Sequence, residues 1–110
     1  MKKFWLLAAF LVFTCEAKAT TGSTLYKACI NTGTTSDAGW CLGYLQSFID
    51  AEQFSAEVGK RPPRFCMPSN ITMIHVRETA MKYMTTHTDK IPLDANAILG
   101  AALVQAYSCG

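Results

Sequence analysis

Cysteine and histidine are the most reactive side chains in this sequence, and their spacing decides whether it can be an enzyme. The chain has cysteines at positions 15, 29, 41, 66 and 109 and histidines at 75 and 87. A thiol enzyme needs a cysteine next to a base, and common zinc sites use H-x-x-x-H or H-E-x-x-H spacing. Neither these histidine spacings nor C-x-x-C or G-x-S-x-G motifs occur. The sequence therefore predicts a binding protein with no catalytic residues, no metal and no cofactor.

Two carboxylates lie close together in the stretch DAGWCLGYLQSFIDAEQF, namely Asp50 and Glu52. A pair of carboxylates on one face would be the arrangement needed for acid–base chemistry. Residues two apart on a helix point to different sides. We therefore expect no paired-carboxylate site here.

The first nineteen residues have the pattern of an export signal. Two lysines precede an apolar run over residues 4–13, and Ala17-Lys18-Ala19 has the form of a cleavage site. The run is shorter than the roughly 20 apolar residues that a membrane-spanning helix needs, so we expect no stable membrane insertion. We predict cleavage after Ala19, which leaves one exported domain over residues 20–110.

Cys15 allows an alternative interpretation, a lipoprotein anchored through this cysteine. The residues before it are Val-Phe-Thr, which are bulky where a lipidation signal has small residues, and this disfavours the alternative. Both interpretations place the domain outside the cytosol, where disulfides persist.

Removing the leader also changes the charge of the protein. Of ten Lys and Arg, three lie in the leader, and of eight Asp and Glu, one does, so seven of each sign remain. A neutral domain with scattered charges has no electrostatic basis for binding nucleic acid or an anionic membrane. We therefore expect no nucleic-acid partner.

The remaining chain is predicted to be a small all-α domain of four helices. Its apolar residues recur at helical spacing, Gly59 and three prolines interrupt them, and no alternating strand pattern occurs. Within the second helix, Gly39 and Gly43 leave one face without side chains, where we expect another backbone to approach. The predicted helices are Thr24 to Asn31, a segment capped by Ser36 that runs to Val58, residues 73–87 capped by Thr72 or Asn70, and a last helix capped by Asp94.

Four cysteines in an exported chain of this size are typical of two disulfides, with three possible connectivities. Consecutive antiparallel helices place the end of one beside the start of the next. Cys29 with Cys41, and Cys66 with Cys109, would each join such neighbouring ends and form the geometrically cheapest pairing. By loop-closure entropy the two bridges would add about 3 and about 4 kcal/mol. Free buried cysteines are the alternative, which the oxidising compartment disfavours.

Several motifs together resemble the Rap/Tai family of type VI secretion amidase immunity proteins. The motifs are WCLGYLQSFIDA, RFCMPSNIT, KYMTTH and AILGAALVQAYSC, and the resemblance extends from about Leu25 to Cys109. It implies a periplasmic, all-helical, often dimeric protein that binds a peptidoglycan amidase injected by neighbouring cells and occludes its active-site cleft. Many relatives have proline after the histidine that ends the third helix, whereas here Thr88 follows His87 and Pro92 comes later.

The resemblance also implies a protruding segment that enters the cleft of the amidase. We predict that this segment is the loop after the third helix, because it is short, polar and closed by Pro92, so that little ordering entropy would be lost on binding. An ordinary solvated connector is the alternative. The predicted contact residues are His87, Thr88, Asp89, Lys90 and Ile91. A second choice is Lys60, Arg61 and Arg64, whose charges would pair with acidic groups of a partner or remain solvated.

Two other functions compete with the immunity hypothesis. A small disulfide-bonded periplasmic stress chaperone is also a compact helical protein, but two histidines and seven acids give it little material for a pH switch. An enzyme is the other, and it lacks a candidate site. A homodimer is a further expectation, with Phe54 and Tyr83 as exposed candidates for its interface.

Overall fold

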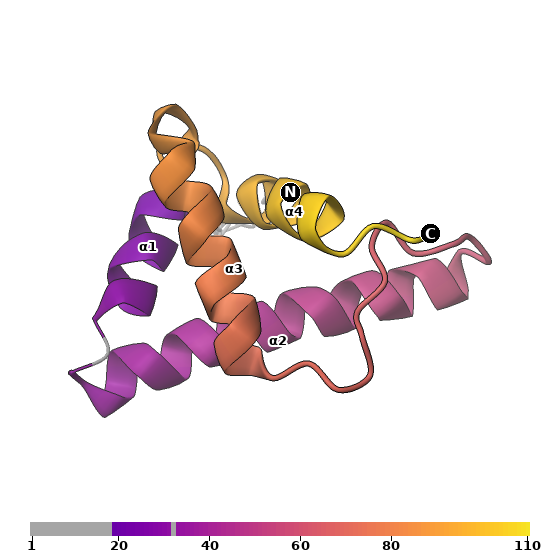
Figure 1. The fold of residues 1–110 in the computed structure, drawn as a ribbon, viewed down its shortest axis with the longest axis horizontal. Coiled ribbons are helices and arrows are strands. Elements are labelled where there is room, and N and C mark those ends of the chain that lie inside the picture. Colours follow the sequence, from indigo (N-terminus) through magenta and orange to yellow (C-terminus); the bar gives the residue numbers. More distant parts are fainter. Residues whose placement is uncertain (1–18, 32) are drawn as a thin grey trace, which may run out of the picture.

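The structure is a computed structural model that describes residues 19–31 and 33–110. Its elements are α1 (Gly22–Ile30), α2 (Thr35–Val58), α3 (Met73–Thr86), the 3-10 turn η1 (Thr88–Lys90) and α4 (Ala95–Ala106). These residues contain no β-strand, only an isolated bridge between Thr21 and Asp94. The predicted all-α fold with four helices is therefore confirmed (Figure 1). The predicted export signal lies outside the described residues, except for Ala19.

Side-chain caps fix where the helices begin. Thr72 accepts a hydrogen bond from the backbone N–H of His75 at 3.2 Å, and Asp94 accepts one from Asn96 at 2.7 Å, as predicted. The predicted cap of α2, Ser36, is wrong. Thr34 takes this role because its hydroxyl accepts from the N–H of Asp37, so α2 begins at Thr35.

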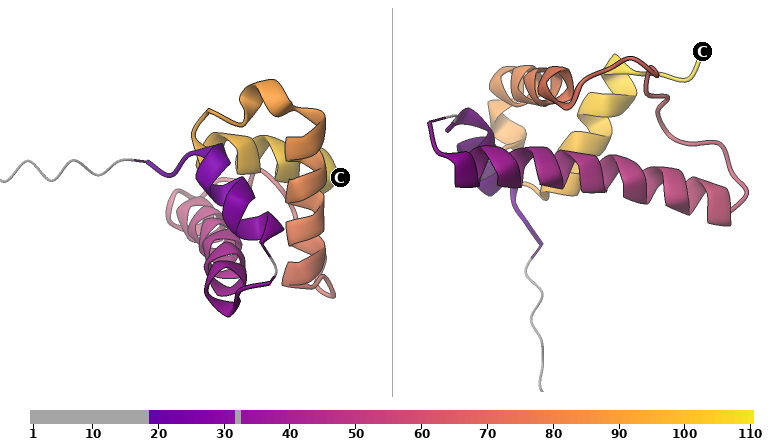
Figure 2. Two further views of the ribbon diagram at one scale, coloured as in Figure 1. Left: turned by 90° about the vertical axis from the view of Figure 1, so that its left-hand side faces the viewer. Right: turned by 90° about the horizontal axis from the view of Figure 1, so that it is seen from below.

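α2 is the longest helix, with 24 residues, and α1, α3 and α4 all lie to one side of it (Figure 2). Its C-terminal end projects beyond the other three helices, and the segment that leads to α3 folds back along one side of this end (Figure 1). The buried residues of all four helices meet between them. The fully buried larger side chains of this core are Leu25, Cys41, Leu45, Val76, Met84, Leu99 and Leu103.

Both predicted disulfides are present. Cys29 at the end of α1 is bonded to Cys41 of α2, and Cys66 is bonded to Cys109 after α4. The first bridge is buried, whereas both cysteines of the second are exposed. The N–H of Cys66 also donates to the carbonyl of Tyr107 at 2.8 Å. The second bridge therefore joins the segment after α2 to the C-terminus.

The expected close approach at Gly39 and Gly43 is wrong, because a Cβ at either position would meet nothing within 4 Å. The close approach occurs at Gly22 instead. A Cβ there would lie 2.5 Å from the carbonyl oxygen of Ile91 and would overlap the side chain of Ile98. α1 can pack on the start of α4 only because position 22 has no side chain.

None of the helices that the structure describes is both long enough and apolar enough to span a membrane.

Candidate binding surfaces

The predicted contact segment 87–91 forms a tight turn at the end of α3, at the top of Figure 1. The N–H of Lys90 donates to the carbonyl of His87 at 2.9 Å, and the N–H of Leu93 donates to the carbonyl of Lys90 at 2.9 Å. These bonds close η1 without help from any side chain. Backbone hydrogen bonds therefore restrain the turn.

The five predicted residues of this turn do not face the same way. His87 lies back on α3, with its ring stacked on Tyr83 at 3.9 Å between centroids and its Nδ1 2.8 Å from the carbonyl oxygen of Tyr83. A carbonyl oxygen can only accept, so Nδ1 carries a proton in this contact. Ile91 packs against the core, and of the five residues only Thr88, Asp89 and Lys90 are exposed.

Tyr83 is buried beneath His87, with 9% of its surface exposed. The expectation that it is an exposed interface residue is therefore wrong. The reason is local, since the phenol ring lies between the imidazole and the core. Phe54, the other interface candidate, is 67% exposed.

The base of the turn is held by the first described residues of the domain. The N–H of Gly22 donates to the carbonyl of Leu93 at 2.8 Å, and the N–H of Ala95 donates to the carbonyl of Thr20 at 2.8 Å. These two bonds flank the bridge between Thr21 and Asp94. The exposed tip at 88–90 is thus supported by α3 on one side and by the start of α1 on the other.

A groove of about 490 Å³ between α3 and α4 begins next to this turn. Both histidines line it, together with polar residues of α3 such as Glu78 and Lys82, and Ala102 and Gln105 of α4 lie opposite. The sequence did not indicate that the two histidines line one groove, because they are twelve positions apart and form no recognised motif. The groove extends the exposed tip into a larger surface with both polar and apolar side chains.

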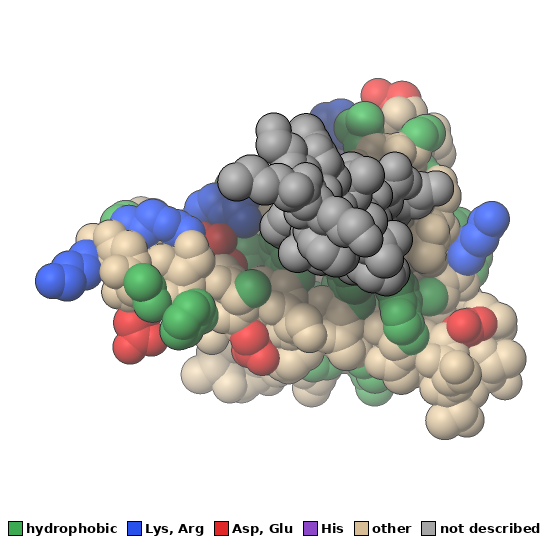
Figure 3. Space-filling view, turned by 180° about the vertical axis from the view of Figure 1, so that it is seen from behind, with side chains coloured by type: hydrophobic (Ala, Val, Ile, Leu, Met, Phe, Trp, Pro, Cys, Tyr) green, Lys and Arg blue, Asp and Glu red, His purple; other side chains and the backbone are tan. Residues whose placement is uncertain are grey.

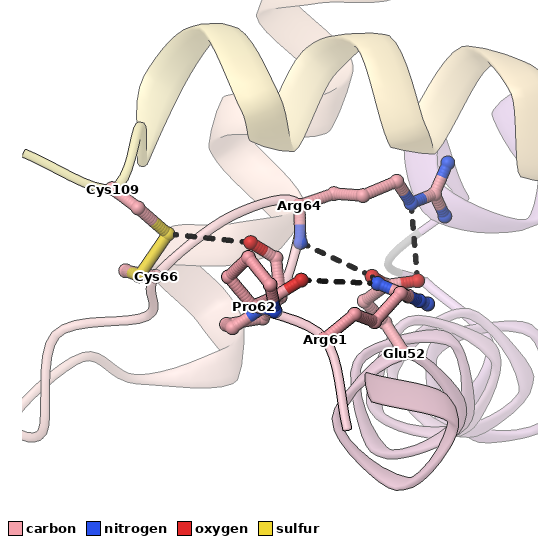
Figure 4. The surroundings of a disulfide bond; sticks show 7 residues. Glu52, Arg61, Pro62, Arg64, Cys66 and Cys109 are labelled. Carbon is pink, nitrogen blue, oxygen red and sulfur yellow. Dashed lines mark hydrogen bonds and ion pairs between the residues drawn. A yellow bond between two sulfur atoms is a disulfide. The ribbon is translucent and has the colours of Figure 1, made fainter. Parts of the chain in front are cut away.

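Of the second predicted group, Lys60, Arg61 and Arg64, the two arginines lie around a buried carboxylate, that of Glu52 (Figure 4). Nη1 of Arg61 donates to Oε1 of Glu52 at 2.9 Å, and Nε of Arg64 donates to Oε2 at 3.0 Å. The backbone N–H of Arg64 donates to Oε1 at 3.1 Å. Glu52 itself is 6% exposed, so this carboxylate is both charged and enclosed.

These donors shift the ionisation of the carboxyl group. They lower the pKa of Glu52 from 4.5 to about 2. The hydrogen bond from Arg61 is the largest cause, and the backbone and side-chain bonds from Arg64 add to it. Together they outweigh burial, which alone would raise the pKa. Glu52 is therefore ionised at any pH above about 4, and it holds the loop after α2 against the helix.

Sequence reasoning missed this internal ion pair. It treated Glu52 only as a neighbour of Asp50 and treated the two arginines as surface charges. A signal was present, because Glu52 follows Cys41, Leu45 and Ile49 on the buried face of α2. A charged residue in an apolar stripe requires a partner of opposite charge, and two arginines follow within twelve positions.

Potential metal ligands are not gathered anywhere in the described part of the chain, where no group of three or more His, Cys, Asp or Glu side chains occurs. The surfaces above present hydrogen-bond donors, acceptors and charged groups, through which a protein can bind another molecule.

Comparison with known proteins gives one match. Residues 21–109 match the protein family described as Rap1a immunity proteins. No curated protein and no solved structure matches the chain. The matched residues include all four helices and both disulfides.

Proposed function

The chain belongs to the Rap1a immunity protein family, and on this premise we propose that it inhibits a type VI secretion peptidoglycan amidase in the periplasm. Immunity proteins protect a cell by binding a cognate effector, and the family match is the observation that carries the proposal. The proposed inhibition is steric, since the protein occludes the active-site cleft of the effector. It protects the producing cell and its kin from their own toxin.

The exposed tip formed by Thr88, Asp89 and Lys90 is the segment that we propose enters the cleft. Its support favours this role, because a rigid segment loses little conformational entropy when it binds. His87 and Ile91 act beneath it by holding the turn on α3 and on the core. The groove beside the turn would extend the contact along α3.

The projecting end of α2 is a second surface for partners. Phe54 and Val58 are 67% and 66% exposed there, one helical turn apart. Exposed apolar side chains of this kind mark interaction surfaces when they are contiguous. We propose this pair as the contact of a homodimer, separate from the effector-binding tip.

The function is tested in cells and with purified proteins. Cells that lack this protein should lyse when the cognate amidase reaches their periplasm, and rescue should require the export signal. The purified protein should co-purify with one amidase from the same genome and inhibit its cleavage of peptidoglycan. Survival of the deletion strain would contradict the proposal, and general protection of unfolded proteins would support a chaperone instead.

The role of the tip is tested by reversing its charges. The double variant D89K/K90E should weaken binding to the amidase by about tenfold or more, because unmatched charges at an interface are costly. The matched control is D50K/K27E, which reverses the same two charge types at exposed positions of α2 and α1. Unchanged affinity of the tip variant, measured by titration calorimetry, would exclude the tip as the contact.

A further inference from the structure

We propose that Arg64 is a binding site for a carboxylate side chain of the partner protein, and that Glu52 is the positioning residue that holds its guanidinium group in place. This inference rests on the proposed function for the identity of the partner. It singles out one side chain from the three cations at the end of α2.

Arg64 combines a fixed inner edge with an open outer end. Its Nε is bonded to Oε2 of Glu52 and its backbone N–H to Oε1. Its side chain is nevertheless 52% exposed, and its terminal nitrogens have no hydrogen-bond partner among the described residues. A guanidinium has five donors in a planar fork. Glu52 uses one of them, and the two terminal NH₂ groups remain for a second carboxylate.

The other two cations lack this combination. Nη1 of Arg61 is shared between Glu52 and the carbonyl of Pro62, and its Nη2 donates to the hydroxyl of Ser55 at 3.2 Å. Both terminal nitrogens of Arg61 are therefore already bonded, to side chains of α2 and to the loop itself. Lys60 is exposed and makes no hydrogen bond within the described residues, so its ammonium group has no fixed position. Arg61 therefore stabilises the loop, whereas the terminal nitrogens of Arg64 remain available to bind a partner.

The surroundings of Arg64 admit a protein partner. Its Nη1 lies over Gly100 of α4, where a Cβ would come within 3.3 Å of it, and the ring of Phe48 lies nearby. Along the same helix, the small residues Ala97 and Ala101 are exposed and Val104 is 41% exposed. A partner segment can lie on this low surface and extend an acidic side chain to the guanidinium.

The local charge favours a negative partner. This end of the molecule carries three positive side chains and two negative ones, the buried Glu52 and the exposed Glu57 at the end of α2. Figure 3 shows the blue side chains gathered at the projecting end of α2, beside exposed hydrophobic ones. A bidentate bond from arginine to a carboxylate is among the stronger charge-assisted contacts.

The experiment uses the protein purified from the periplasm with nitrogen-15 labelling. Acetyl-tetraglutamate amide is titrated into it, with the tetraglutamine peptide and inorganic phosphate as comparisons. The glutamate peptide should shift the Nε–Hε signal of Arg64, and the glutamine peptide should not. An unshifted Arg64 signal would overturn the proposal, and so would an equal response to phosphate at the same concentration.

Variants then test the site with the cognate amidase. R64Q should weaken binding about tenfold or more, R64K should fall between R64Q and wild type because lysine lacks the fork, and K60Q should bind like wild type. G100A keeps every charge but displaces Nη1, so it should also weaken binding, and it serves if R64Q does not fold. Equal affinity of folded R64Q and wild type would overturn the site. If the wild-type protein binds no amidase, the proposed function fails, and the peptide titration alone decides about Arg64.

Discussion

Glu52 carries a negative charge inside the domain, surrounded by donors from a single loop. Because the loop donates three hydrogen bonds to it, the path of residues 61–64 depends on one carboxylate. The same loop leads directly to Phe65, which is buried, and to the disulfide at Cys66. Glu52 therefore fixes the start of the loop against α2, and the disulfide fixes its continuation against the C-terminus.

The lowered pKa of Glu52 makes stability depend on pH. The folded protein favours the ionised form, since the pKa falls from 4.5 to about 2 on folding. The stabilisation is therefore complete above about pH 4.5 and is lost as the pH falls toward 2. E52Q should lower the free energy of unfolding at pH 7 by about 1.5–3 kcal/mol, the usual contribution of a charged hydrogen bond. It should also remove much of the slope between these pH values.

Urea unfolding at a series of pH values checks this prediction. The matched control is E57Q, which removes an exposed carboxylate five positions further along α2. It should change neither the stability at pH 7 nor its slope by a measurable amount. An unchanged slope in E52Q would show that Glu52 is not the responsible group.

For single residues, the sequence indicates which kinds of side chain are present but not which residues they pair with in the fold. The absence of catalytic motifs and the four cysteines of the domain could be read directly from it. The pairing of Glu52 with Arg61 and Arg64 could not, because it depends on how the chain turns after Gly59. Lys60 has a positive φ of 50° in that turn, which no local pattern predicts.

The packing of α1 against the start of α4 depends on a glycine at the start of α1. Gly22 lies against the backbone of Ile91, so a side chain there cannot be accommodated by a rotamer change alone. G22A should therefore destabilise the domain by about 1–3 kcal/mol, as overpacking does. G43A is the matched control. It has open space around it within α2 and should stabilise by about 1 kcal/mol through helix propensity.

Thermal unfolding followed by circular dichroism distinguishes the two glycine variants. They should shift the melting temperature in opposite directions. If G22A melted at or above the wild-type temperature, the close packing of α1 on the start of α4 would be contradicted.

The helices themselves could be predicted because their signals are local. Thr72 and Asp94 precede apolar residues at helical spacing, and both act as caps. Ser36 failed as a cap because Thr34 is a residue of the same class two positions earlier. The role of Gly22 could not be predicted, since Ile91 and Ile98 contact it from about seventy positions away in the sequence.

For the whole molecule, the two disulfides differ in exposure and in the size of the loop they close. Cys29–Cys41 spans 12 positions and is buried, whereas Cys66–Cys109 spans 43 positions and is exposed. Mild reduction should therefore open Cys66–Cys109 first. Removing this bridge as C66S/C109S should cost about 4 kcal/mol, against about 3 for C29S/C41S, because the longer loop restricts the unfolded chain more.

Alkylation followed by mass mapping measures the order of reduction, and urea unfolding of the two double variants measures the cost. Earlier alkylation of Cys29 and Cys41 would contradict the predicted order. The pairing itself was predictable from the order of helices and cysteines. The difference in exposure was not, because it depends on where α2 ends relative to the other helices.

The connectivity has a consequence for how the domain matures. Within residues 20–110, the first cysteine is bonded to the second and the third to the fourth. A polypeptide oxidised in the order in which its thiols emerge from a translocation channel, N-terminus first, would form both native bonds without exchange. Its maturation should need a thiol oxidase and no disulfide isomerase.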